Sequence, residues 1–228
     1  MKHKKKDKSS KYDRERFEQM GEHADALNPK VVVDGKPHLT MKPDRAKVHI
    51  ERYKTINRLK EGKSVIDCPC GFGYASKILD YEFYSGFDIS ETAINYANAR
   101  YKTDKASFHL ADATKPINYS ADTVISVEGI EHLLEPEKLF ANLANCANKE
   151  LIISYPEGWP INAMFEDGQR VAGGYHVSCI TTDYILLLAE KYKLKQAGMV
   201  CMDDFGNVYP HKKFREVQLP CSIVRFIK

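Results

Sequence analysis

The sequence predicts an α/β protein with a mostly parallel sheet, and three observations indicate it. An apolar run ends in Asp67 and is followed by a glycine-bearing turn, Cys68-Pro69-Cys70-Gly71-Phe72-Gly73. A second apolar run, Phe83 to Phe87, ends in another carboxylate, Asp88. Further short β-branched or aromatic runs follow, separated by helix-compatible sequence. A strand, a glycine turn and a helix in this order place a nucleotide-sized pocket at the carboxyl end of the first strand.

The glycine turn narrows the kind of ligand. Gly71 and Gly73 let the backbone approach a ligand closely because neither carries a Cβ. The turn is not the dinucleotide-binding G-x-G-x-x-G, since Ser76 stands where the third glycine belongs, and it lacks the Lys and Ser/Thr of a P-loop. Asp88 can accept hydrogen bonds from both hydroxyls of a ribose. Two glycines also occur in turns that bind no ligand, so the turn alone leaves both interpretations open.

The turn resembles the first motif of the class I S-adenosylmethionine-dependent methyltransferases, in which two hydrophobic residues precede Asp-x-x-Cys-Gly-x-Gly. Phe108–Ala113, Thr123–Glu128 and Leu151–Pro156 resemble the family's third motif, fourth strand and fifth strand, in the family's order. This resemblance implies a Rossmann-like three-layer sandwich with a seven-stranded, mostly parallel sheet whose last strand, Cys221–Ile227, is antiparallel. It also implies that the cofactor, S-adenosyl-L-methionine, is held by Asp67, Cys70, Gly71, Gly73, Asp88, Ile89, Asp112, Ala113 and Glu128.

The region before the first strand falls into two parts. Residues 1–11 are rich in lysine and have no apolar residue after Met1, so we expect a disordered tail. This tail either holds a nucleic-acid backbone, such as RNA, or only keeps the chain soluble. Residues 12–62 have helical periodicity over Glu15–Leu27 and Asp44–Leu59, and the resemblance implies a helical cap over the cofactor cleft.

The methyltransferase domain is predicted to span residues 63–228, and its long loop at 158–176 is expected to select the substrate. Trp159 and Phe165 can stack a sugar or another ring, and Arg170 can hold a carboxylate or phosphate. Trp159 can equally close the core beneath the loop. Two further elements complete the prediction, a helix over Asp183–Tyr192 and a strand over Met199–Met202.

The chemistry is predicted to follow the fourth strand. Glu128, Glu131 and His132 are spaced i, i+3 and i+4, so they share one face if the segment is helical, and His176 comes later. Two carboxylates and two imidazoles suit a divalent cation, Mg or Mn. The pattern resembles small-RNA 2′-O-methyltransferases of plants and O-methyltransferases of ubiquinone biosynthesis, and implies that all four residues bind a metal. The alternative is a metal-free enzyme in which His132 packs or acts as a base.

A methyl on a sulfonium is already activated, so the enzyme must mainly align the acceptor atom. Base methylation is disfavoured, because Glu128-Gly129-Ile130-Glu131 stands where an Asn/Asp-Pro-Pro-aromatic tetrapeptide is expected. We expect O-methylation of a hydroxylated small molecule or sugar, with catalytic roles for Glu131, His132 and His176. The alternatives are an RNA ribose as acceptor, or a non-catalytic cofactor-binding protein that accompanies nucleic acid.

Composition sets further limits. A chain of 228 residues, 43% apolar, can bury one substantial core. No apolar run approaches the roughly 20 residues needed to span a bilayer, and the basic N-terminus lacks the apolar region of a secretory signal. The six cysteines are scattered, so we expect reduced thiols and a cytoplasmic protein without a membrane partner.

Overall fold

The structure is a computed structural model that describes residues 25–27, 32–33, 36–37, 43–158, 165–166, 169–170, 176–210 and 221–228. The predicted tail at 1–11 lies outside the described residues, as do Trp159 and most of the predicted helix Glu15–Leu27. Of the predicted substrate loop, two short strands are described, β8 (Phe165–Glu166) and β9 (Gln169–Arg170), which pair antiparallel. The predictions for the other residues remain predictions.

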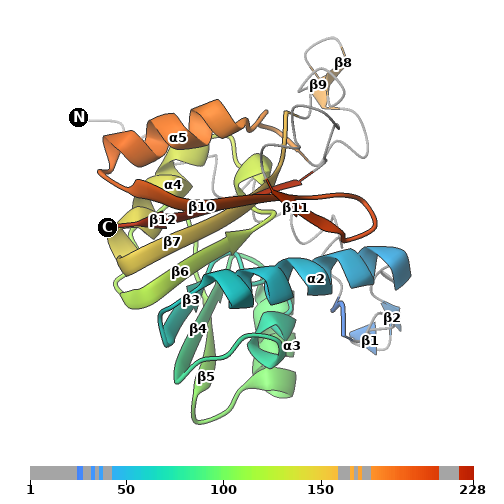
Figure 1. Ribbon diagram of the computed structural model, residues 1–228. Helices are drawn as coiled ribbons and strands as arrows, with labels where there is room; N and C mark the ends of the chain where they lie inside the picture. The colour runs from blue at the N-terminus through green and yellow to red at the C-terminus, as the bar shows by residue number, and fades with distance from the viewer. Residues whose placement is uncertain are drawn as a thin grey trace, which may run out of the picture.

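Among the described residues, eight strands form one sheet in the order β11-β10-β12-β7-β6-β3-β4-β5, which is the middle layer in Figure 1. Five neighbouring strands are parallel, as predicted. These are β3 (Ser64–Asp67), β4 (Phe83–Asp88), β5 (Ala106–Leu110), β6 (Ala121–Val127) and β7 (Ala147–Pro156).

The other edge of the sheet is antiparallel. β12 (Cys221–Ile227) lies between β7 and β10 (Lys195–Met202) and is antiparallel to both, which confirms the predicted antiparallel last strand. The predicted count of seven strands is one too low, because β11 (Val208–Pro210) pairs with the outer edge of β10. Three residues that end in proline are too short a pattern to indicate a strand.

Helices cover both faces of the sheet (Figure 1). α2 (Pro43–Leu59) and α3 (Glu91–Tyr101) lie on one face, and α4 (Pro136–Cys146) and α5 (Thr182–Lys191) on the other. Local sequence explains where two of these helices begin, because the side chain of Ser90 caps the N-terminus of α3 and that of Thr181 caps the N-terminus of α5. A further antiparallel pair, β1 (Val32–Val33) and β2 (Lys36–Pro37), precedes α2. Of the helices in the described part, none is long and apolar enough to cross a bilayer.

Each face of the sheet has its own hydrophobic core. One core packs Phe140 of α4 and Leu188 of α5 against strand residues such as Phe226. The other packs Tyr53 and Ile56 of α2 with residues of α3 and the sheet. Ile56 is fully buried, and burial of such a side chain stabilises a fold by about 1.5–3 kcal/mol. The helix predicted over Asp44–Leu59 therefore packs on the sheet together with α3, and the two helices form one outer layer of the sandwich.

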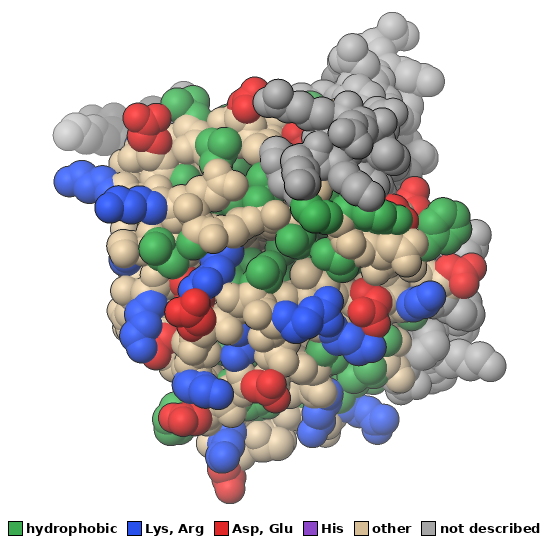
Figure 2. Space-filling view, viewed as in Figure 1, with side chains coloured by type: hydrophobic (Ala, Val, Ile, Leu, Met, Phe, Trp, Pro, Cys, Tyr) green, Lys and Arg blue, Asp and Glu red, His purple; other side chains and the backbone are tan. Residues whose placement is uncertain are grey.

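The surface on the α2 side mixes both signs of charge. Figure 2 shows Lys and Arg side chains interspersed with Asp and Glu on this face rather than gathered into one basic area. The formal net charge of +3 for the whole chain agrees with that balance.

Candidate functional site

The site lies where β3 and β6 end. The glycine turn after β3 and the turn after β6 touch, since a Cβ on Gly129 would lie 2.4 Å from Cδ of Pro69. Only glycine fits at that contact. The turn predicted to bind the cofactor and the turn predicted to carry the chemistry therefore form one site.

Gly73 has a second role that the sequence did not indicate. Its φ is 77°, a left-handed conformation that favours glycine. A Cβ on Gly73 would lie 2.5 Å from the ring of Phe108 and 2.8 Å from Ala97. The close approach that this glycine permits in the structure is to β5 and α3, so the glycine is required by packing whether or not a ligand is bound.

Asp88 organises the turn around it. Its Oδ2 accepts a hydrogen bond from the Gly71 amide (2.8 Å) and its Oδ1 one from the Ser90 amide (2.9 Å). Each carboxylate oxygen has a second lone pair, so these bonds are compatible with the predicted contacts to ribose hydroxyls. Asp88 is 2% exposed, and Ile89 beside it is half-buried.

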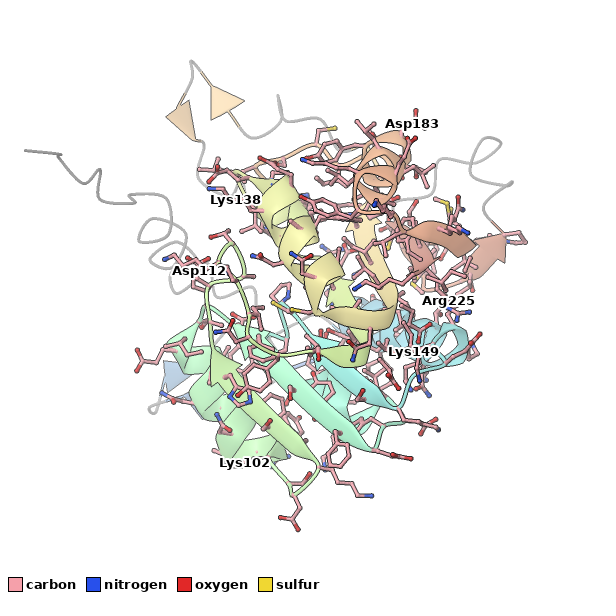
Figure 3. The ribbon with its side chains drawn as sticks, turned by 90° about the vertical axis from the view of Figure 1, so that its left-hand side faces the viewer. Lys102, Asp112, Lys138, Lys149, Asp183 and Arg225 are labelled. Atoms are coloured by element: carbon pink, nitrogen blue, oxygen red, sulfur yellow. The ribbon has the colours of Figure 1, made fainter. Side chains whose placement is uncertain are left out.

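Asp112 and Ala113 follow β5, and Figure 3 shows Asp112 on the loop there. Oδ1 of Asp112 accepts hydrogen bonds from the amide and hydroxyl of Thr114 (2.9 and 2.6 Å). Its Oδ2 lies 3.1 Å from Nζ of Lys115. Both predicted residues are half-buried, at the edge of the sheet where Asp67 and Asp88 end their strands.

Asp67 lies beneath the turn rather than on its surface. It is 0% exposed, and its Oδ2 accepts a hydrogen bond of 2.7 Å from the Tyr84 hydroxyl. Burial raises the pKa of Asp67 to about 8, and the Asp88 carboxylate contributes to the rise while the Tyr84 hydrogen bond opposes it. Cys70 is also buried, and burial raises the pKa of its thiol. Both residues, predicted to bind the cofactor, thus form the floor of the turn.

The turn after β6 brings three of the four predicted metal ligands together. Glu131, His132 and His176 offer ligand atoms that all lie within 4.8 Å of one another. Oε1 of Glu131 is 3.8 Å from Nε2 of His132 and 4.0 Å from Nε2 of His176. Atoms bound to one cation at about 2.0–2.2 Å lie roughly 3 Å apart, so small side-chain movements would close this set. One carboxylate and two imidazoles offer the mixed oxygen and nitrogen ligands that a divalent ion can take.

His176 reaches this cluster because the backbone after it is tied to the same turn. The amides of Val177 and Ser178 donate to the carbonyl of Glu131 (2.8 and 3.1 Å). The Ser178 hydroxyl donates to the carbonyl of Leu133 (2.6 Å). These three bonds explain how a residue 44 positions beyond His132 in the chain comes beside it.

Glu128 is held apart from the cluster. Its φ is 50° and it precedes a short 3₁₀ turn, Ile130–His132, so the helical face assumed from the spacing does not exist here. Its Oε1 accepts hydrogen bonds from the Ser154 hydroxyl (3.0 Å) and the Cys221 thiol (3.4 Å). Its Oε2 lies 3.4 Å from Nη2 of Arg52.

Arg52 is the functional candidate that sequence reasoning passed over. It is 5% exposed and comes from α2, far from Glu128 in the chain. Burial alone would lower the pKa of Arg52, but the Glu128 carboxylate holds that pKa above its ordinary value. A polar residue on the buried side of a helix was the available signal, since Tyr53 and Ile56 mark that side.

Comparisons with known proteins agree with this arrangement. The model of a methyltransferase-domain family matches residues 66–151. A comparison with curated proteins finds no match. Magnesium protoporphyrin IX methyltransferase from Synechocystis PCC 6803, solved with bound S-adenosylmethionine, is similar with a TM-score of 0.66 at 15% identity, over 96% of this chain and 97% of that chain.

Two further solved structures are similar over most of this chain. The methyltransferase domain of the bacterial protein CtHen1-CN has a TM-score of 0.58 at 18% identity, over 79% of this chain and 100% of that chain. An S-adenosylmethionine-dependent methyltransferase from Aquifex aeolicus has a TM-score of 0.55 at 18% identity, over 82% of this chain and 93% of that chain. The glycine turn, the strand order and these likenesses agree, and the chain has the class I S-adenosylmethionine-dependent methyltransferase fold.

Proposed function

We propose that this protein transfers the methyl group of S-adenosylmethionine to a hydroxyl oxygen of an acceptor with neighbouring hydroxyls. The observation that carries the proposal is the convergence of Glu131, His132 and His176 beside the cofactor turn. An aliphatic hydroxyl is a poor nucleophile, so the enzyme must assist loss of its proton as well as align its oxygen. A carboxylate between two imidazoles suits that task.

In the favoured form of the proposal, the same three residues hold a divalent cation, Mg or Mn. Such an ion lowers the pKa of a bound hydroxyl and fixes its position. Glu131 supplies the carboxylate oxygen, His132 and His176 supply imidazole nitrogens, and the ties from Val177 and Ser178 to the Glu131 carbonyl keep the set assembled. If no cation is used, His132 is the base, with the Glu131 carboxylate 3.8 Å away to orient its ring.

The favoured acceptor is a small polar metabolite or sugar. The mixed charges on the α2 side and the modest net charge support a small acceptor over a long polyanion. The second candidate is the 2′-hydroxyl of an RNA ribose. The spacing of the two Glu and two His residues, which resembles that of small-RNA 2′-O-methyltransferases, supports that candidate.

A methyl-transfer assay with radiolabelled cofactor tests the proposal. Diol-bearing metabolites and sugars are compared with an RNA that ends in a ribose and the same RNA ending in a 2′-deoxyribose. Labelling of a hydroxylated small molecule supports the favoured acceptor, and labelling of only the ribose-ended RNA supports the second. Cofactor binding without transfer to any hydroxyl, across both sets and with Mn²⁺ present, would contradict the proposed activity and favour the non-catalytic alternative.

The cation has its own test in the same assay. Excess chelator should abolish transfer, and added Mn²⁺ should restore it. Full activity in excess chelator would exclude a role for the cation in methyl transfer and leave His132 as the base.

A further inference from the structure

The buried ion pair between Arg52 and Glu128 joins the N-terminal helix α2 to the turn that carries Glu131 and His132. Arg52 is 5% exposed and the Glu128 side chain 15% exposed, so the two charges face each other with little water between them. Arg52 also feels the Glu131 carboxylate, which contributes to the raised pKa of the guanidinium. A positive charge from α2 therefore lies beside both carboxylates of the turn.

Three separate elements restrain Glu128 in its position. Arg52 comes from α2, Ser154 from β7 and Cys221 from β12, and all three contact the Glu128 carboxylate. The backbone is restrained as well, because Gly129 packs against Pro69 of the glycine turn. A rotation of the Glu128 side chain toward the cluster of Glu131, His132 and His176 would break the three contacts of its carboxylate.

The rotation would also take the nearest carboxylate away from Arg52. Nε of Arg52 is buried and has no hydrogen-bond partner among the described residues, and the Glu128 carboxylate is the largest favourable influence on the buried guanidinium. Breaking a buried pair by removing one partner is strongly unfavourable, because it leaves an uncompensated charge in a medium that solvates it poorly.

We propose that Arg52 is a positioning residue that keeps Glu128 from binding the cation, so that the protein holds its metal with Glu131, His132 and His176 alone. This inference rests on the metal-assisted form of the proposed function. With one carboxylate, the site keeps more of the charge of a divalent ion than it would with two. That charge favours the ionised form of an acceptor hydroxyl, and three protein ligands leave open positions for acceptor oxygens on a six-coordinate ion.

Calorimetric titration of the full chain with Mn²⁺ tests this inference through metal affinity, without an acceptor. Glu128→Gln and Glu131→Gln make a matched pair, because both replace a carboxylate by an amide in the same turn. Glu131→Gln should weaken Mn²⁺ binding at least about 100-fold, above the range for residues that only support a ligand. Glu128→Gln should change it by no more than about 3-fold, the effect of a charge outside the coordination sphere.

Arg52→Met should tighten Mn²⁺ binding for two reasons, loss of a nearby positive charge and release of Glu128. The double variant Arg52→Met/Glu128→Gln separates them, since only release of Glu128 requires the carboxylate. We expect the double variant to lose most of the tightening. A thermal melt of each variant shows whether it is folded, and if Arg52→Met does not fold, the comparison of the two Gln variants still decides.

A loss of affinity in Glu128→Gln equal to that in Glu131→Gln would show that Glu128 is a ligand, and would overturn the inference while leaving metal assistance intact. Equal tightening in Arg52→Met and the double variant would also overturn it, because Glu128 would then contribute nothing when released. Absence of Mn²⁺ binding by the unaltered protein would overturn the metal-assisted function together with this inference.

Discussion

Two buried carboxylates at opposite ends of the parallel strands show how differently this fold treats the same chemical group. Glu150, at the start of β7, is 1% exposed, and Asp67, at the end of β3, is 0% exposed. Glu150 accepts hydrogen bonds from the amides of Glu61 and Gly62 (2.7 and 2.9 Å), from the Thr123 hydroxyl and from Arg225. Asp67 accepts a hydrogen bond from the Tyr84 hydroxyl, and the Tyr53 hydroxyl also donates toward it.

The pKa values follow from these partners. Burial would raise the pKa of Glu150, but hydrogen bonds from Thr123, Gly62, Glu61 and Arg225 outweigh burial and lower it. Asp67 has too few donors to offset burial, so its pKa rises to about 8. Figure 3 shows Arg225, the partner of Glu150, on the other side of the view from Asp112, which follows β5. At the amino end several donors satisfy the buried carboxylate, and at the carboxyl end the effect of burial prevails.

The largest effect is expected when a side chain at the carboxyl end of the strands is removed, because activity should fall while the protein stays folded. His132→Ala should lower kcat about 10²–10⁴-fold, the usual contribution of a group that manages a proton in the transition state. The free energy of unfolding and the affinity for S-adenosylmethionine should change little. Steady-state kinetics with any accepted acceptor, urea unfolding and calorimetry measure the three quantities. A large loss of stability would mean that this end also supports the fold.

A substitution at the amino end of the strands should change the stability of the protein and leave cofactor binding unchanged. Glu150→Ala takes the acceptor from the amides of Glu61 and Gly62, from the Thr123 hydroxyl and from Nε of Arg225, although Arg225 keeps its ion pair with Glu61. Each buried donor left unsatisfied costs about 1–3 kcal/mol. Urea unfolding should show that loss, while the cofactor affinity of the folded protein stays the same. Lys149→Ala is the control, since Lys149 is exposed and its ion pair with Asp122 should contribute no measurable stability.

Cofactor affinity tests the carboxyl end directly. Asp88→Ala should weaken S-adenosylmethionine binding by about 1.5–3 kcal/mol, the range for hydrogen bonds to a charged group. Asp80→Ala is a suitable control, because Asp80 is exposed and bonds only to Asn57 among the partners described. Calorimetry that finds equal affinities for the two folded variants would refute the predicted ribose contact of Asp88.

The last prediction concerns how the free energy of unfolding depends on pH, and it compares Asp67 with Glu150. The folded-state pKa of Asp67 is raised, so its contribution to stability is complete below the unfolded pKa and is lost as pH rises toward about 8. Compared with Asp67→Asn, the unaltered protein should lose stability over that window, by at most about 1.4 kcal/mol per pH unit. The lowered pKa of Glu150 has the opposite sign, so its contribution should be lost as pH falls. Urea titrations that give the same sign for Asp67→Asn and Glu150→Gln would contradict the comparison.

The part of the structure that sequence could predict depended on local pattern. The strands ending in Asp67 and Asp88, the helix at Asp44–Leu59 and the antiparallel strand at Cys221–Ile227 all have a clear apolar period, and the structure confirms them. β11 was missed because three residues have no period to detect.

The site was harder, since its contacts join distant parts of the chain. The positive φ of Glu128 directs its side chain away from the helical face that the i, i+3 spacing assumes. The residues around position 128 give no indication of this backbone conformation. The partners of Glu128 come from α2, β7 and β12, and those of Glu150 from three separate segments. Such pairings depend on how the layers pack, which periodicity does not report.

The amides of Val177 and Ser178 donate two hydrogen bonds to the Glu131 carbonyl, and these bonds have a consequence for exchanging the segment that precedes them. They make His176 the boundary between a part of the chain that can be replaced and a part that cannot. A graft that brings residues 159–175 from another methyltransferase should keep the imidazole beside Glu131, so acceptor preference can change while the chemistry is retained. A graft that continues through Ser178 would discard the anchor and remove His176 from the site. If the loop at 158–176 selects the acceptor as predicted, exchange of this segment should change the substrate, provided that the junction stops at residue 175.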